Sequence, residues 1–430
     1  MTEVVKLLEV PYLKEEDTMA FLRTHGRVLF LVRGPPGAGK KPVRDEIKKL
    51  YPGSQDYCAE MFFQEDTTRE WNNNSRTEAH ELCQRKIEEF MAKDVPFIIN
   101  FNTNIQVWEA NRYLEMAARH SYTVILVNIP HHFILNTEIL LQTNKDKPHD
   151  LSERYLSERL KIWEEVHPYA TGWSPRPRDA AELLSRFRQI REALQNADPA
   201  MAPKDAVNSK VTPFALARIC RFGHVKSDEN YCESEKVKRA YGRKDTLTVF
   251  GYAIAKGFVF ALVKLTGAQV LLTKGHECVD DGGNGEDQED DLRRLREAKV
   301  TVYDWKEVRA EQDLAKFMAA DAEHSLNIRF GSRINLTDLD QSTVTVIPLG
   351  GCDGKDFSYS QAVTSPWALL SSKLRSWISA EELSDRPATI AGIDVFGSPE
   401  SADDACLLID EAMVEVDAVF TGLYYPYTTA

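Results

Sequence analysis

The sequence predicts two domains: an α/β domain built on a parallel sheet, followed by an α+β domain of antiparallel strands. In the first half of the chain, short and wholly apolar runs alternate with segments of helical periodicity. Such strands, separated by helices, are typical of a parallel sheet covered on both faces. In the second half, strand-like runs rich in β-branched and aromatic residues are interrupted by glycine, which favours hairpins. We place the first domain at residues 1–195, an Ala-, Pro-, Asp- and Ser-containing linker at 196–213, and the second domain at 214–430.

Each domain has its own series of predicted elements. Those of the first domain are strand 27–33, helix 78–93, strand 95–100, helix 106–120, strand 122–129 and two long amphipathic helices, 151–166 and 179–197, that close the domain. Those of the second domain are strand character over 246–273, strand 300–305, strand 342–350, strands within 388–396, strand 415–425, and helices at 291–298 and 365–383. The acidic run 276–291 has little apolar content and predicts a mobile insertion, with a calcium loop as the alternative.

Composition excludes several classes of protein. The 430 residues are 43% hydrophobic and 28% charged, a balance that supports buried cores. The net charge of −13 disfavours broad coating of nucleic acid or an anionic membrane, although it leaves room for a local basic pocket. No apolar run reaches the length of about 18 residues that a transmembrane helix needs. We find no signal-peptide core, no C-terminal cysteine for prenylation and no CxxC spacing, so we expect a cytoplasmic chain without a metal site.

The strongest local motif is a glycine-rich loop that follows the strand at 27–33. It fits the P-loop pattern G-x-x-x-x-G-K, in which backbone N–H groups surround a phosphate and the lysine reaches the terminal phosphates. The predicted nucleotide-binding residues are Gly34, Gly37, Ala38, Gly39, Lys40 and Lys41. Lys41 stands where a complete P-loop has the Ser or Thr that binds Mg²⁺, and lysine cannot ligate a cation. We therefore expect binding of ATP or another nucleotide without metal-dependent transfer; the alternative is a turn that binds nothing.

Two further positions test whether kinase chemistry is present. Glu60, after the second strand, is the available carboxylate for a proton-accepting role. At the end of the strand at 95–100, where a metal-binding acid is expected, the chain has Asn100, Asn102 and Asn104 instead. Amides in place of acids argue against metal or base chemistry. The simpler interpretation is a polar turn that caps the next helix through Thr103 or Asn104.

Longer stretches carry a resemblance to a known family. Residues 8–40, 57–62, 101–104 and 170–173 resemble the N-terminal, polynucleotide-kinase-like domain of the 2',3'-cyclic-nucleotide 3'-phosphodiesterase family. Residues 229–255, 265–273 and 415–425 resemble its phosphodiesterase domain. The resemblance covers most of the chain and implies a two-histidine-phosphoesterase-like fold for the α+β domain.

The resemblance also implies where catalytic residues belong. Such domains use two H-x-T/S motifs, whose histidines move protons and whose hydroxyls hold the phosphate. At the matching positions this chain has Ala217 and Ile219 for the first motif, and Val346 and Pro348 for the second. None of its ten histidines is followed two residues later by Ser or Thr. The catalytic positions are therefore degenerate, and we name no confident catalytic residue.

The leading hypothesis is a catalytically impaired or inactive relative that acts by binding. Its ligand would be a nucleotide or phosphate at the glycine loop, or an unknown protein partner such as cytoskeletal or RNA-processing machinery. One alternative is an active phosphodiesterase that hydrolyses 2',3'-cyclic nucleotides to 2'-nucleotides through a rearranged site, with His224 or His324 moved into the cleft. Another is an active nucleotide or polynucleotide kinase.

Overall fold

The computed structural model divides the chain into two compact units, each assembled from separated stretches of sequence. The first unit comprises Met1–Thr171, Ile219–Lys244 and Val419–Thr429, and the second comprises Gly172–Arg218, Asp245–Ala418 and Ala430. This division differs from the predicted one at 196–213. The structure describes residues 8–129, 140–141, 152–203, 206–207, 213–274, 326–330, 339, 343–352, 370, 372–374, 388–397 and 405–424. The predicted acidic insertion, the strand at 300–305, the helix at 291–298 and most of the helix at 365–383 lie outside the described residues.

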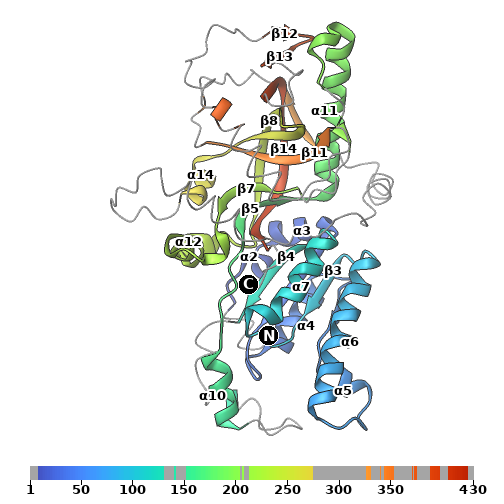
Figure 1. Cartoon of the computed structure of the whole chain (residues 1–430), viewed down its shortest axis with the longest axis vertical. Helices are drawn as coiled ribbons and strands as arrows, with labels where there is room; N and C mark the ends of the chain where they lie inside the picture. Colours follow the sequence, from blue (N-terminus) through green and yellow to red (C-terminus); the bar gives the residue numbers. More distant parts are fainter. Residues whose placement is uncertain are drawn as a thin grey trace. The chain divides into compact units, whose positions relative to one another are not determined.

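The first unit is built on a parallel sheet of four described strands in the order β2-β3-β1-β4 (Figure 1). Its elements are α2 (Pro11–Lys14), α3 (Glu16–His25), β1 (Val28–Arg33), α4 (Lys40–Leu50), β2 (Gln55–Tyr57), α5 (Met61–Glu65), α6 (Asn73–Ala92), β3 (Phe97–Asn100), α7 (Val107–Arg119), β4 (Thr123–Asn128), α10 (Glu153–Lys161), α12 (Lys226–Glu233) and α13 (Glu235–Ala240). The predicted strands at 27–33, 95–100 and 122–129 are confirmed as β1, β3 and β4.

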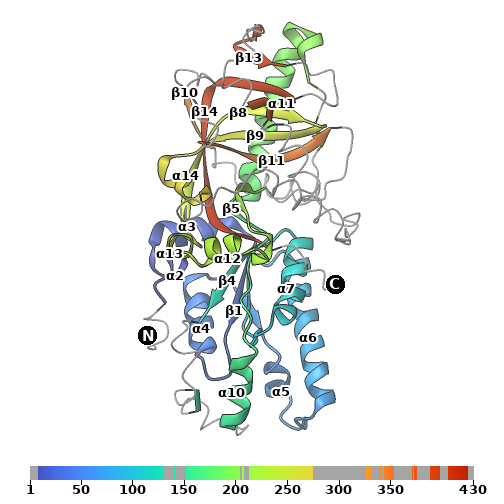
Figure 2. The ribbon, with the colours of Figure 1, turned by 60° about the vertical axis from the view of Figure 1, so that its left-hand side comes forward.

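Helices cover both faces of this sheet, and for that reason β1, β3 and β4 are mostly apolar, whereas the short β2 is polar. Every residue of β1 is buried. Side chains alternate across a strand, so Phe30 and Val32 pack with residues of α3 and α4, whereas Leu29 and Leu31 pack with residues of α6 and α7. The turned view shows α4 on one side of β1 and β4, and α6 and α7 on the other (Figure 2).

Residues from late in the chain complete the first unit. The buried hydroxyl of Tyr241 accepts a hydrogen bond from the Leu126 N–H at 3.0 Å and lies 2.9 Å from the Tyr424 hydroxyl. Thr421 Oγ1 donates to the Val124 carbonyl at 2.7 Å. Val419 is buried in the same apolar cluster as α3 and α4. The core of this unit therefore depends on chain segments that are far apart in sequence.

The second unit is built on an antiparallel sheet whose described strands follow the order β12-β13-β14-β8-β9-β11-β6; β10 and β5 also pair with β14, and β7 pairs with β5. Its elements are β5 (Ala170–Pro175), α11 (Pro177–Ala197), β6 (Ala206–Val207), β7 (Ala215–Ile219), β8 (Lys244–Ala255), β9 (Phe258–Lys264), α14 (Gly267–Thr273), β10 (Asn327–Phe330), β11 (Val344–Cys352), β12 (Ala388–Ile390), β13 (Ile393–Phe396) and β14 (Ala405–Leu423). Of these strands, β5, β7, β8 and β14 contribute residues to both units.

Two predictions about helices are corrected by this unit. Helix α11, expected to close the first domain, belongs to the second unit and contacts β11. Arg186 on α11 pairs with Asp410 of β14, and the Phe187 ring lies 5.8 Å from that of Tyr252. The last seven residues of the predicted strand stretch 246–273 form α14, because Thr266 and Gln269 cap each other at its start.

Among the residues that the structure describes, none of the helices combines the length and hydrophobicity needed to cross a lipid bilayer.

Candidate functional site

The glycine loop lies at the carboxyl edge of the parallel sheet, between the end of β1 and the start of α4. Arg33 ends β1 and Lys40 begins α4, so the loop occupies residues 34–39. In open α/β sheets ligands bind at this edge. The Gly34 N–H donates to the Thr103 carbonyl at 3.0 Å, which fastens the loop to the segment that follows β3.

Backbone conformation explains why the loop needs its glycines. Gly37 and Gly39 have φ angles of +86° and +94°, in the left-handed region that other residues avoid. Gly39 is the N-cap of α4, so the loop leads directly into the positive end of that helix dipole. A Cβ at Gly34 would lie 3.0 Å from Ile129 Cγ1 and 3.2 Å from Ala38 Cβ. Ala38 itself is buried. Gly34, Gly37, Ala38 and Gly39 thus share one tight turn, and Lys40 and Lys41 begin the helix that follows it.

Lys40 folds back over the loop. Its Nζ donates to the carbonyl oxygens of Gly34 and Pro35 at 2.8 and 2.9 Å. Neutral carbonyl oxygens therefore hold the ammonium group beside the loop. A phosphate oxygen could replace them as acceptors, and the resulting hydrogen bonds would be stronger because both groups are charged.

Lys41 and Glu60 form an ion pair beside the loop. Lys41 Nζ lies 2.9 Å from Glu60 Oε1, and both side chains are about two-fifths exposed. Glu60 was the carboxylate predicted to be available for a proton-accepting role, and here it is bound to a cation. The pair joins the start of α4 to the segment before α5. Within this pair the Lys41 ammonium occupies the position where a complete P-loop has a hydroxyl, and Glu60 balances its charge.

The three asparagines at the end of β3 and just after it form hydrogen bonds along the carboxyl edge of the sheet. Asn102 Oδ1 accepts from the Ala59 N–H at 2.8 Å, and its Nδ2 donates to the Tyr113 hydroxyl at 2.8 Å. Asn104 Nδ2 donates to Asn100 Oδ1 at 2.9 Å. All three asparagines are buried. Their amides connect β2, β3 and α7 by hydrogen bonds. A carboxylate in the same buried positions would lose the favourable solvation of its charge.

The predicted capping role of Thr103 or Asn104 is wrong. Helix α7 begins at Val107 with Gln106 as its N-cap. Glu109 accepts from the Ile105 N–H at 2.6 Å, and Glu164 accepts from the Val107 N–H at 2.7 Å. Carboxylates thus satisfy the first amide groups of the helix, as the helix dipole favours.

The buried guanidinium of Arg33, directly before the loop, binds the segments next to it, and the sequence analysis did not identify it. Arg33 is fully buried and donates to the carbonyls of Asn104, Ile105 and Glu164 at 2.7, 3.1 and 2.8 Å. Its guanidinium also lies 4.6 Å from the centre of the Trp163 ring. One side chain therefore fixes the segment after β3 and the segment after α10 relative to the loop.

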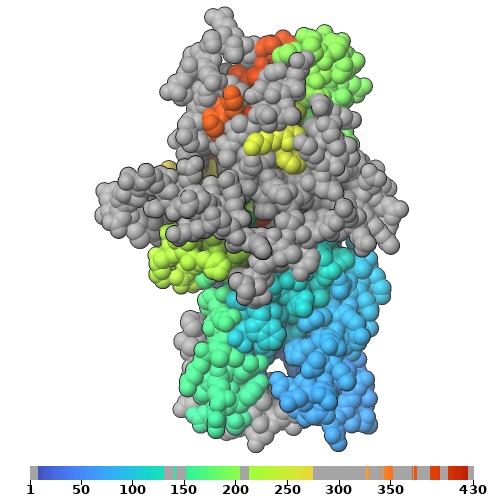
Figure 3. All heavy atoms as spheres, in the orientation of Figure 1, coloured from blue at the N-terminus to red at the C-terminus, as the bar shows by residue number. Residues whose placement is uncertain are grey.

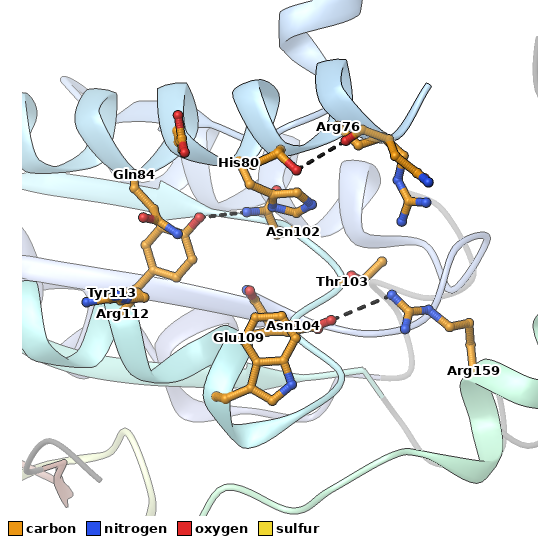
Figure 4. Close-up of a pocket in the computed structure, with 14 residues that line it drawn as sticks. Arg76, His80, Gln84, Asn102, Thr103, Asn104, Glu109, Arg112, Tyr113 and Arg159 are labelled. Carbon is orange, nitrogen blue, oxygen red and sulfur yellow. Dashed lines mark hydrogen bonds and ion pairs between the residues drawn. The ribbon is translucent and has the colours of Figure 1, made fainter. Parts of the chain in front are cut away.

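A pocket of about 540 Å³ adjoins the loop at Thr103. Its walls come from α6, α7, α10 and the segment after β3, and Arg76, His80, Trp108, Arg112 and Arg159 are among its residues (Figure 4). In the space-filling view a hollow separates the surface of α5 and α6 from that of α10 (Figure 3). Sequence reasoning missed this pocket. A signal was present, because Arg76, His80 and Gln84 recur every four residues and so share one polar face of α6.

The degenerate catalytic positions are not among the residues that line this pocket. Ala217 and Ile219 are half-buried on β7. Val346 is buried in an apolar cluster of the second unit, and Pro348 is buried in β11 where its register with β9 shifts. His224 is exposed, and His324 lies outside the described residues.

Comparisons with known proteins support the resemblance at the level of a distant relationship. The chain is 25% identical over 285 residues to 2',3'-cyclic-nucleotide 3'-phosphodiesterase of Mus musculus and 24% identical over 289 residues to the protein of that name from Rattus norvegicus. Each alignment covers 62% of this chain. The chain spans just under two thirds of these relatives, 64% and 65% of their lengths.

A shorter similarity involves a different protein. The chain is 31% identical over 100 residues to NEDD4-binding protein 2 of Homo sapiens, which covers 23% of this chain and 6% of that protein. No protein-family model matches the chain.

Proposed function

We propose that this chain is a phosphodiesterase relative that binds a nucleotide at Gly34–Lys40 and does not transfer its phosphate. ATP is the ligand to test first. The observation that supports the proposal is a tight glycine turn at the start of α4, with positive φ at Gly37 and Gly39, beside the Lys41–Glu60 ion pair. The Gly34 and Ala38 N–H groups already donate within the protein, so the proposal rests on the first N–H groups of α4, at the positive end of its dipole, and on the Lys40 ammonium. Lys41 places an ammonium group where a metal-binding hydroxyl would otherwise stand, and Glu60 holds it in position.

The surroundings of the loop favour binding over transfer. Phosphoryl transfer needs a metal that bridges two phosphates and a group that orients the nucleophile. Glu60 is paired with Lys41, and Asn102 is occupied by Ala59 and Tyr113. The protein partner predicted from the sequence stays a prediction.

Thermal unfolding with and without ATP tests the proposal. At ATP concentrations about 100 times Kd, binding adds about 2.7 kcal/mol to the stability of the folded state, so we expect Tm to rise by several degrees. Lys40→Ala should abolish this rise, because it removes the ammonium at the mouth of the loop. Lys49→Ala is the matched control, since Lys49 lies on the same helix with its side chain 72% exposed. An ATP response that is unchanged in Lys40→Ala, or absent from the parent protein, contradicts the proposal.

Magnesium dependence separates binding through Lys41 from ordinary P-loop binding. In the parent protein we expect ATP to bind in EDTA as tightly as in Mg²⁺. Lys41→Ser supplies the missing hydroxyl and removes the fixed cation, so ATP binding by this variant should require Mg²⁺. Titration calorimetry in the two buffers measures both effects. Strong dependence of the parent protein on Mg²⁺ would contradict the assigned role of Lys41.

A second candidate function is hydrolysis of 2',3'-cyclic nucleotides, which the names of the relatives favour. Against it stand Ala217, Ile219, Val346 and Pro348, because none of these side chains can transfer a proton. We expect purified protein to leave 2',3'-cyclic AMP intact in a chromatographic assay. Turnover that follows the protein through successive purification steps would favour this second function instead.

A further inference from the structure

The pocket beside the glycine loop combines positive charge with an exposed aromatic surface. Arg76, Arg112 and Arg159 reach it from three different helices, against Glu81 and Glu109 on the same walls. Its volume of about 540 Å³ lies within the range of small-molecule sites. Figure 4 shows Arg76 and Arg159 entering from opposite sides, with Thr103 between them.

Two of these guanidinium groups have hydrogen-bonding capacity to spare. Within the described part of the chain, the half-buried Arg76 forms no side-chain hydrogen bond or ion pair; the dashed line near it in Figure 4 joins Thr77 to the Asn73 carbonyl. Arg159 lies 3.6 Å from Glu109, and its buried Nε has no hydrogen-bond partner among the described residues. Guanidinium groups present five N–H donors in a geometry that matches phosphate. A phosphate between Arg76 and Arg159 would accept hydrogen bonds from the accessible terminal N–H groups of both side chains.

His80 lies under the influence of both arginines. Partial removal of its ring from water lowers the pKa of His80, because burial disfavours the charged imidazolium. The Glu109 carboxylate raises this pKa, and the positive charges of Arg76 and Arg159 lower it. The side chain is nevertheless exposed at the pocket surface. A neutral imidazole offers one donor and one acceptor, which suit the hydroxyls or the edge of an uncharged group.

Trp108 supplies the aromatic part of the site. Its side chain is 60% exposed on the pocket wall, and its Nε1 donates to Gln106 Oε1 at 3.2 Å. An exposed indole face stacks on nucleobases with a free energy of about 1–3 kcal/mol per base. The arginine N–H groups suit the phosphate of a nucleotide, the neutral imidazole suits its hydroxyls, and the exposed indole suits its base.

We propose that this pocket is a second site, which binds a nucleoside monophosphate through Arg76 and Arg159 at the phosphate and Trp108 at the base. The ligand is either a free nucleotide or the terminal nucleotide of a single strand, because the two share this chemistry. The site goes beyond the glycine loop and does not depend on it, although Thr103 brings the two into contact.

Titration of the full chain with 5'-AMP, adenosine and inorganic phosphate tests the pocket. Arg76→Ala should weaken AMP binding about tenfold or more and leave adenosine binding unchanged. Trp108→Ala should weaken both, and Trp108→Phe should recover part of the loss. Arg85→Ala is the matched control, because Arg85 is an exposed arginine of the same helix outside the pocket. Equal Tm values of the variants without ligand verify that they fold, and Arg76→Lys replaces Arg76→Ala if the latter does not.

The results distinguish this pocket from the glycine loop. We expect Lys40→Ala to bind AMP like the parent protein. AMP binding that is lost in Lys40→Ala but kept in Arg76→Ala would assign AMP to the loop and overturn the proposal. Phosphate binding as tight as that of AMP, or no AMP binding at all, would also overturn it. A short 5'-phosphorylated oligoadenylate that binds at least tenfold tighter than AMP identifies a strand end as the source, and equal affinity identifies a free nucleotide.

Discussion

The amide of Asn102 forms structural hydrogen bonds at a position where a kinase-like site would need an acid. Its oxygen accepts from Ala59 and its nitrogen donates to Tyr113, with Cys83 Sγ 3.4 Å away. Burial raises the pKa of Cys83 to about 11, so this thiol stays protonated. The amide thus sits among neutral partners, and a charge introduced there would lose the solvation it has in water.

Asn102→Asp should therefore destabilise the protein without creating a metal site. The new acid would be buried, which raises its pKa in the folded state above the unfolded value of about 3.9. The folded state then binds more protons than the unfolded state, so stability falls as pH rises through the interval between the two pKa values. We expect a loss of about 1–3 kcal/mol at pH 7 in urea unfolding, and a smaller loss near pH 4.

Asn73→Asp serves as the control for this change, because Asn73 is exposed in the first turn of α6, where a carboxylate is favoured. A loss of stability in Asn102→Asp that does not vary with pH would contradict the explanation by burial.

At the scale of elements, the ion pairs of Glu233 connect the end of α12 to its neighbours. Glu233 accepts from His167 Nε2 at 2.9 Å and pairs with Lys238 Nζ at 2.7 Å. These partners lower the pKa of Glu233 to about 2. A depressed pKa contributes stability that is complete above the unfolded value of about 4.3 and is lost as pH falls toward 2.

Glu233→Gln should cost less than about 1 kcal/mol near neutral pH, because Glu233 is 41% exposed and such pairs are screened by solvent. The difference in free energy of unfolding from the parent protein should narrow below about pH 4. Urea unfolding at several pH values measures it. Glu235→Gln is the matched control on the adjacent helix, where the carboxylate is 78% exposed. A difference that persists undiminished toward pH 3 would contradict this account.

The success of sequence-based prediction differed among elements for physical reasons. Strands β1, β3 and β4 were predictable because burial on both faces leaves an uninterrupted apolar run. Helix α14 was mistaken for a strand although Thr266 and Gln269 carry the spacing of a capping box. Helix α11 was predicted as a helix but assigned to the wrong partner. Its periodicity indicates which face is apolar, and does not indicate which sheet that face covers.

The candidate site was predictable only in part for a related reason. The glycine loop is local in sequence, so its residues could be named in advance. The pocket is assembled from residues between Asn73 and Arg159, and its existence depends on how α6, α7 and α10 pack. Arg33 escaped notice because a charged residue at the end of an apolar strand does not by itself indicate burial.

At the scale of the whole molecule, the first unit requires parts of the chain that the predicted domain boundary removes. A fragment of residues 1–203 lacks Tyr241, Val419 and Thr421, and with them the contacts to Leu126 and Val124. We expect this fragment to lose cooperative unfolding and to bind the dye ANS, because part of its core is missing. Calorimetry of the fragment beside the full chain measures the difference. A fragment that unfolds cooperatively at the Tm of the full chain would contradict the division into units.

The late position of Val419 also has a consequence for folding during synthesis. The strands and helices up to residue 129 leave the ribosome about 290 residues before the segment that completes their core. At about 5–20 residues per second, this interval lasts about 15–60 s. Throughout it the nascent unit exposes the apolar surface that Val419 will cover. We expect the growing chain to depend on chaperones at this stage, long after its glycine loop has formed.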